Sequence, residues 1–216
     1  MDTLLVSWDR FWIAAGARQP APGLLAELLL AWTEPHRHYH NLQHLAECLS
    51  LLEAHAHLAK SPAAIGLALF FHDAIYDPPA QDNEARSADW ARQALGAAGF
   101  EERFIEQVAD MILATRHATQ EAEGDTALLL DIDLAILGAN PHRFAEYEAQ
   151  VRAEYAWVAE PAFRTARAQL LRSFLARPHL YRTAAFAELE SRARGNLDTA
   201  LRTLENTSDT AEHEAA

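Results

Sequence analysis

Apolar residues recur every three or four positions along most of this chain, and no segment alternates strictly between apolar and polar residues. This spacing is typical of amphipathic helices, whose apolar stripe faces a core. Proline or glycine stands at several breaks between the periodic segments, where helices start or stop. The segments that we predict to be helical are Leu4–Ala15, Leu24–Trp32, Asn41–Leu58, a helix starting at Ser61-Pro62, Asp82–Ala98, Phe100–Thr115, Asp125–Leu137, two helices starting at Asn140-Pro141 and Glu160-Pro161, and a last helix that fades near Asn206. The predicted fold class is therefore all-α, a bundle of about eight to ten helices.

The same pattern indicates one folded domain followed by a polar C-terminal tail. We find no internal repeat, no low-complexity linker and no block of charge inside the body of the chain. At 216 residues, 50% of them hydrophobic, the chain is long enough to bury one sizeable core. We predict a single all-helical domain over residues 1–205. Residues 206–216 are too polar to fold and are predicted to be a disordered acidic tail.

The composition limits the classes of binding partner and the cellular location that we expect for this protein. The formal net charge of −13 argues against binding to nucleic acid polymers or anionic lipid, because their phosphates would be repelled. Cys48 is the only cysteine, so we expect no disulfide framework and no cysteine zinc site. Asp2 and Asp9 stand where a signal peptide needs a basic start, and the longest apolar stretch, Ala63–Phe71, is too short to cross a bilayer. We therefore expect a cytoplasmic protein that binds no membrane.

Histidines are frequent in the stretch RHYHNLQHLAEC, residues 37–48. On a helix with about 100° of rotation per residue, His44 lies with Cys48 and Leu51 at the edge of the apolar arc and points inward. His40 lies one turn earlier on nearly the same side. A single inward histidine is most often a core residue that bonds a backbone carbonyl, so this stretch alone does not indicate a site.

A second pair of polar residues ends the most apolar helix. The stretch AAIGLALFFHDAIYD, residues 63–77, begins apolar on every face, as a central helix does, and then reaches His72 and Asp73. A carboxylate buried at a helix carboxy terminus is costly unless a cation or hydrogen-bond donors compensate, because the helix dipole is already negative there. A bound metal ion would supply that cation.

Asp131 and Asp133 repeat this pattern in DTALLLDIDLAILG. Residues two apart on a helix are separated by about 200°, so the two carboxylates cannot face one point. One of them can bind a metal ion, while the other needs a separate partner, such as an arginine. The spacing leaves open which aspartate does which.

The predicted inward groups are His44, His72, Asp73 and one of these two aspartates. Two neutral imidazoles and two carboxylates form a nitrogen-and-oxygen site that neutralises one divalent ion, and they suit manganese, iron, cobalt, nickel or zinc. The zinc-protease pattern is absent, because Asn41 and not glutamate follows His40. No glycine-rich phosphate loop occurs either.

Four short blocks give this set a family resemblance. They are RHYHNLQH, FFHDAIYDP, DNEARSA and DIDLAILG, between about residues 36 and 138. In this order they resemble the HD superfamily of metal-dependent phosphohydrolases, most closely an uncharacterised bacterial family described as predicted HD phosphohydrolases. YHNLQH also resembles the start of the metal site in cyclic nucleotide phosphodiesterases. After His72 and Asp73, this chain continues with AIYDPPAQDNE, whereas the phosphodiesterases have a histidine-containing continuation. Cyclic nucleotide specificity is therefore not implied.

The resemblance implies an HD-type domain and roles for individual residues. The metal ligands that it implies are His44, His72, Asp73 and Asp133. Asp133 is selected because family motifs place this aspartate directly before a leucine or a basic residue, and Asp131 stays the alternative. His40 would be the general acid that protonates the leaving oxygen. Asp73 would bridge two ions or accept the proton of the attacking water, so one or two ions are expected.

Further polar residues are candidates for the pocket. By resemblance, Asn83 and Glu84 line the pocket and bond metal-bound water, with Glu84 taking part in catalysis. Ordinary capping of a helix start is the alternative for both. Arg37 and Arg116 are candidates for phosphate contact, because an arginine fork matches phosphate oxygens, although surface arginine is the commoner role. His117 is a candidate for substrate contact or for holding a second ion.

The predicted function is that of a metal-dependent phosphohydrolase, either a phosphomonoesterase or a phosphodiesterase. It would cleave a small phosphoester, with nucleotides among the candidates, by attack of a metal-bound water. Two alternatives remain: a di-iron oxygenase on the same fold, and a regulatory module that binds metal or nucleotide without catalysis. The expected partner is a small phosphorylated substrate, and homodimer formation is left open.

Overall fold

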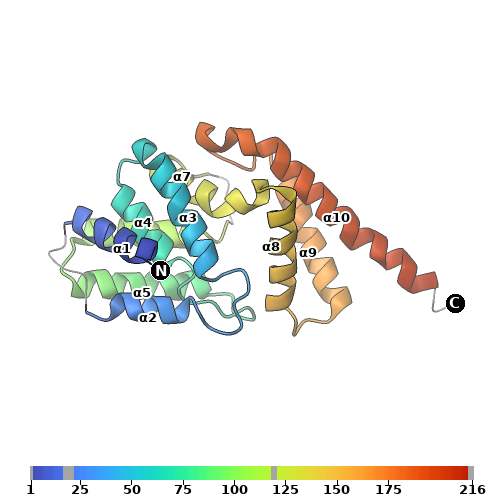
Figure 1. The fold of residues 1–216 in the computed structure, drawn as a ribbon, viewed down its shortest axis with the longest axis horizontal. Helices are drawn as coiled ribbons and strands as arrows, with labels where there is room; N and C mark the ends of the chain where they lie inside the picture. The colour runs from blue at the N-terminus through green and yellow to red at the C-terminus, as the bar shows by residue number, and fades with distance from the viewer. Residues whose placement is uncertain (1, 17–21, 118–120, 214–216) are drawn as a thin grey trace. The chain divides into compact units, whose positions relative to one another are not determined.

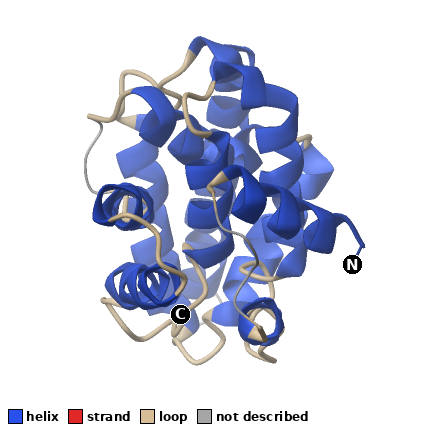
Figure 2. Ribbon diagram, turned by 90° about the vertical axis from the view of Figure 1, so that its left-hand side faces the viewer, coloured by secondary structure: helices blue, strands red, loops and turns tan. Residues whose placement is uncertain are grey.

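The computed structural model describes residues 2–16, 22–117 and 121–213, which consist of helices joined by loops (Figure 1; Figure 2). This part of the chain contains ten α-helices and three short 3-10 helices, and no β-strand occurs in it. The predicted all-α class, with about eight to ten helices, is confirmed.

Most helix boundaries lie within a few residues of the predicted ones. The elements are α1 (Asp2–Ala14), α2 (Leu24–Ala31), α3 (Leu42–His55), η1 (Ala56–Leu58), α4 (Pro62–Phe71), α5 (Asn83–Ala97), α6 (Glu102–Ala114), α7 (Gly124–Asp133), η2 (Leu134–Gly138), α8 (Pro141–Glu154), α9 (Glu160–Leu175), η3 (Ala184–Leu189) and α10 (Glu190–His213). One predicted cap is wrong: Asp125 lies inside the first turn of α7, and its carboxylate accepts hydrogen bonds from the main-chain N–H groups of Lys60 and Ser61.

The chain divides into two compact units, residues 1–133 and 134–216. The junction is the point at which α7 ends and η2 begins. The predicted single domain over residues 1–205 spans both units. Residues 206–213 of the predicted disordered tail form the end of α10, and residues 214–216 lie outside the described residues.

The N-terminal unit is built around α4. Nine consecutive residues of this helix, Ala63–Phe71, are buried, and α4 contacts α1, α3, α5, α6 and α7. The ring of Trp8 from α1 meets that of Phe70 edge-on, with 5.0 Å between centroids. A Cβ atom on Gly66 would lie 2.3 Å from the Phe11 ring, so the glycine allows α1 to pack closely. This central helix therefore carries its last residues, and the histidine after them, into the interior of the unit.

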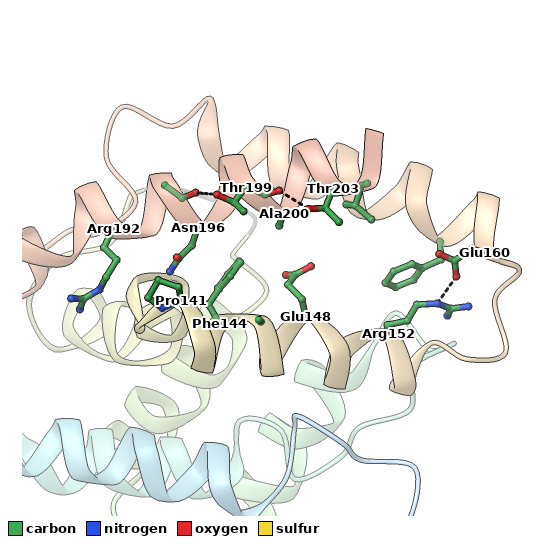
Figure 3. Close-up of a pocket in the computed structure, with 14 residues that line it drawn as sticks. Pro141, Phe144, Glu148, Arg152, Glu160, Arg192, Asn196, Thr199, Ala200 and Thr203 are labelled. Atoms are coloured by element: carbon green, nitrogen blue, oxygen red, sulfur yellow. Dashed lines mark hydrogen bonds and ion pairs between the residues drawn. The ribbon is translucent and has the colours of Figure 1, made fainter. Parts of the chain in front are cut away.

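In the C-terminal unit, α10 contacts η2, η3, α8 and α9. Arg167 of α9 forms an ion pair with Glu148 of α8, and Asn196 of α10 donates to the carbonyls of Leu137 and Ala139. A hollow of about 630 Å³ lies between α8, α9 and α10 (Figure 3). Its lining contains no histidine. None of the described helices is both long enough and apolar enough to cross a membrane.

Candidate metal centre

His44 is placed by the start of α3. Asn41 caps this helix, because its side-chain oxygen accepts a hydrogen bond from the N–H of Gln43 at 2.8 Å. His44 is then in the first turn, with a relative exposure of 2%. Below it, the Cys48 sulfur lies 3.7 Å from His44 Nδ1. His44 therefore faces the interior of the N-terminal unit.

His72 is the C-cap of α4, and Asp73 follows it. The ring Nδ1 of His72 lies 2.8 Å from the carbonyl oxygen of Leu69, so Nδ1 carries the hydrogen in that bond. The remaining nitrogen, Nε2, then presents its lone pair on the other side of the ring. Backbone bonds of this kind orient metal-binding histidines in proteins. His72 is 1% exposed, so its ring cannot turn toward solvent without leaving the core.

Asp133, the last residue of α7, supplies a carboxylate between the two imidazoles. Its Oδ1 lies 3.2 Å from His44 Nε2 and 3.5 Å from His72 Nε2. Its Oδ2 lies 2.9 Å from Nε2 of His117. Asp131 is fully buried and is not one of the residues that meet at this point.

The donor atoms of His44, His72 and Asp133 all lie within 4.8 Å of one another. The two Nε2 atoms are 3.2 Å apart. Asp73 approaches this group with its Oδ2, 3.1 Å from His72 Nε2 and 3.9 Å from His44 Nε2. Donor atoms bound to one ion at about 2.0–2.2 Å lie about 3.0–3.5 Å from their neighbours. Most of these separations match that spacing, so the residues fit a divalent ion.

The charges at this centre favour a cation. Burial alone would raise the pKa of Asp73, but the His72 ring, with His40 further away, holds that pKa well below its ordinary value. Burial also opposes ionisation of Asp133, whose pKa is held well below its usual range by hydrogen bonds, the largest from His117. Burial would lower the pKa of His72, yet the two carboxylates raise it well above its ordinary value. Two ionised carboxylates thus meet here, and either a proton or a metal ion can lie between them.

His40 lies beside the centre. Its ring stacks on that of Tyr76 with 4.2 Å between centroids, and its centroid is 6.0 Å from that of His44. It is half-buried, so its ring adjoins both the centre and solvent. An imidazole at such a place can carry a proton to a group bound at the centre.

Two residues predicted to bind substrate are instead committed to main-chain contacts. The Arg37 side chain is buried and donates to the carbonyls of Asp73 and Ala74. Asn83 pairs with the main chain of Asp77, accepting from its N–H at 3.1 Å and donating to its carbonyl at 2.9 Å. Substrate contact by either residue would require breaking these bonds, so their geometry favours a structural role.

Arg116 and Glu84 lie together. Arg116 Nε is 3.5 Å from a Glu84 oxygen, and its Nη2 donates to the carbonyl of Gln81 at 3.0 Å. The Arg116 side chain is 47% exposed and directly precedes His117, which contacts Asp133. Of the two arginines predicted to contact phosphate, Arg116 is therefore the one that is accessible to solvent. Glu84 is adjacent to that arginine, and its predicted catalytic role stays a prediction.

Sequence reasoning missed the aromatic residues around the centre. Trp32 donates from its indole nitrogen to the carbonyl of Phe70 at 2.9 Å, and its ring lies 5.4 Å from that of His72. Tyr76 stacks on His40. Tyr76 lies in a loop, where helical periodicity assigns no face. Trp32 is the last residue of the predicted helix Leu24–Trp32, and periodicity does not tell which histidine its ring meets.

Comparison of the chain with protein-family models gives no match, and the comparisons with curated proteins and with solved structures give none either. The assignment of function therefore depends on the geometry of the centre and on the sequence motifs.

Proposed function

We propose that this protein is a metal-dependent phosphohydrolase that cleaves a small phosphoester. The observation that carries the proposal is the convergence of two buried imidazole Nε2 atoms, 3.2 Å apart, with the carboxylates of Asp73 and Asp133. A nitrogen-and-oxygen donor set of this kind suits manganese, iron, cobalt, nickel or zinc.

In this proposal, His44, His72 and Asp133 hold the ion, and Asp73 adjoins it. A divalent ion there would lower the pKa of a bound water and neutralise phosphoryl oxygens, which is the chemistry that phosphoester hydrolysis needs. The carboxylate of Asp73 lies beside the imidazoles, with its Oδ2 3.1 Å from His72 Nε2, so it can accept the proton of a water bound next to it.

In this proposal, residues around the ion protonate the leaving group and bind the phosphate. His40 would donate a proton to the departing oxygen, and stacking on Tyr76 orients its ring. Arg116 offers a solvent-accessible guanidinium to the phosphate, and Glu84 orients that guanidinium. We place this activity in the cytoplasm, on a small phosphorylated substrate with nucleotides among the candidates.

The test begins with metal content. Protein purified without a chelator or affinity tag should contain close to one or two divalent ions per chain by elemental analysis. It should then hydrolyse at least one member of a panel comprising p-nitrophenyl phosphate, bis(p-nitrophenyl) phosphate and common nucleotides.

Two variants make this test specific. Asp73→Ala should abolish turnover, because it removes the carboxylate next to the imidazoles. Asp77→Ala, which removes an exposed carboxylate four positions later, should leave turnover at the wild-type level. Turnover that survives Asp73→Ala would come from a contaminant. Protein that takes up no divalent ion would show that a proton, and not a metal ion, balances the two carboxylates.

A further inference from the structure

Arg37 connects the main chains of two residues at the proposed site. It lies in the segment between α2 and α3, and its side chain is fully buried. Its Nη1 donates to the carbonyl oxygen of Asp73 at 2.6 Å and to that of His40 at 3.2 Å. One nitrogen thus holds the backbone of the carboxylate residue and the backbone of the candidate general acid.

The rest of the guanidinium is held as firmly. Nη2 donates to the carbonyl of Ala74 at 3.0 Å, and Nε donates to the Glu34 carboxylate at 2.9 Å. The rings of Trp32 and Tyr76 lie near the guanidinium carbon, at 5.6 and 5.4 Å. A planar fork fixed by in-plane bonds and flanking rings has little freedom to rotate.

Arg37 also compensates negative charge at the carboxy terminus of α4, where the sequence places the Asp73 carboxylate. The carbonyls of Asp73 and Ala74 follow the carboxy terminus of α4, where the helix dipole is negative and the Asp73 carboxylate adds a full charge. Arg37 supplies a permanent positive charge and two hydrogen bonds to this region. A bound metal ion is therefore not the only compensation for the carboxylate.

We propose that Arg37 is a positioning residue that fixes the main chains of His40 and Asp73 relative to each other. The inference rests on the proposed function, which makes those two residues the general acid and the metal-adjacent carboxylate. In this role Arg37 acts through those two residues and not by contact with substrate or metal. It holds both residues in place before either ligand binds.

The first test needs no metal. Hydrogen exchange is measured on the metal-free full chain for peptides covering residues 36–44 and 72–77, which contain the N–H groups of Asn41 and Ala74. Those groups bond the carbonyls of Tyr39 and Phe71. Arg37→Ala should speed exchange in both segments together, and millimolar guanidinium chloride should restore protection where sodium chloride does not.

The second test measures binding of Mn²⁺ alone by calorimetry. Loss of a residue that orients metal ligands typically weakens affinity by about 10–100-fold. We expect Arg37→Lys to fold and to bind Mn²⁺ about 10-fold more weakly, because an ammonium cannot reproduce the fork. Glu34→Gln keeps the three carbonyl bonds and should change affinity less than threefold. Arg10→Lys is the matched control, because Arg10 is an exposed arginine of the same unit.

The outcomes separate the two proposals. If wild-type protein binds no Mn²⁺ and no other divalent ion, the proposed function fails, while hydrogen exchange still decides whether Arg37 couples the two segments. If exchange in Arg37→Lys and Arg37→Ala rises in only one segment, or rises across the whole N-terminal unit without rescue by guanidinium, the positioning role is wrong. Unchanged Mn²⁺ affinity in both variants would also overturn it.

Discussion

The Nε2 atoms of His44 and His72 lie 3.2 Å apart, although the residues are 28 positions apart in the chain and come from different helices. Nδ1 of His72 is already bonded to a backbone carbonyl. Two neutral rings in this arrangement would direct lone pairs at each other unless one nitrogen carried a proton or a cation lay between them. A cation held between the two nitrogens would stabilise the pair, as would a proton on one of them.

This relationship predicts that His44→Asn and His72→Asn each weaken Mn²⁺ binding at least 100-fold, because each removes one nitrogen ligand. Calorimetry measures the affinity, and denaturant unfolding measures the linked stability. At 100 times the dissociation constant, Mn²⁺ should raise the free energy of unfolding of the wild-type protein by about 2.7 kcal/mol. His142→Asn changes a histidine that is 86% exposed and should bind Mn²⁺ normally. Equal affinity in His72→Asn and His142→Asn would refute the ligand assignment.

The two aspartates of α7 should respond differently to the same substitution. Asp133→Asn should weaken Mn²⁺ binding at least 10-fold, because Asp133 Oδ1 lies between the imidazoles. Asp131→Asn changes a fully buried carboxylate and should cost about 1–3 kcal/mol of stability with little effect on Mn²⁺ affinity. Calorimetry and denaturant unfolding on both variants test this. The assignment is reversed if Asp131→Asn loses the metal and Asp133→Asn keeps it.

His117 should act through Asp133. It has a φ of 52°, a left-handed conformation that costs a non-glycine residue about 1–2 kcal/mol, and its Nε2 lies 2.9 Å from Asp133 Oδ2. Removing the ring should free Asp133 and weaken Mn²⁺ affinity about 10-fold in both His117→Ala and His117→Gly. Since glycine accepts this φ without strain, His117→Gly should be about 1 kcal/mol more stable than His117→Ala. If His117→Ala and His117→Gly lost different amounts of Mn²⁺ affinity, the cause would lie in the backbone and not in the lost ring.

Helical periodicity accounts for most of what the sequence predicted correctly. Repeats of three or four residues located the helices, and the apolar arc of α3 placed His44 inward, because both depend on local geometry. Periodicity could not choose between Asp131 and Asp133, since each faces some neighbour and only the tertiary packing decides which neighbour holds the imidazoles. The family resemblance selected Asp133, and the structure brings that carboxylate to His44 and His72.

Other features depend on contacts between distant segments and carry no local signal. Arg37 was expected to face a phosphate, but its partners include carbonyls near residue 73 that only folding brings near. Asn83 was a candidate for the pocket by the family resemblance, and its amide pairs with the main chain of Asp77. Side chains that bond the main chain of another segment are therefore the ones that sequence reasoning assigns least well.

Asp125 provides a prediction about stability that is separate from the metal. Its two carboxylate oxygens accept from the N–H groups of Lys60 and Ser61 at 2.8 and 2.7 Å, and the residue is 9% exposed. Asp125→Asn leaves one of these N–H groups facing an amide N–H₂, and a buried donor without an acceptor costs about 1–3 kcal/mol. Asp125→Ala should cost more, because both donors lose their acceptor. Denaturant unfolding measures these losses, with Asp89→Ala, an exposed carboxylate, as the control.

Asp125 anchors the start of α4, whereas His72 and Asp73 follow its end. A helix of ten residues is about 15 Å long, so a loosened start need not move the metal ligands. We therefore expect Asp125→Asn to bind Mn²⁺ within about twofold of wild type while it unfolds at lower denaturant concentration. Mn²⁺ should also add the same increment of stability to the variant as to the wild type, because the two effects arise at separate sites. A large loss of affinity in Asp125→Asn would mean that α4 transmits strain along its whole length.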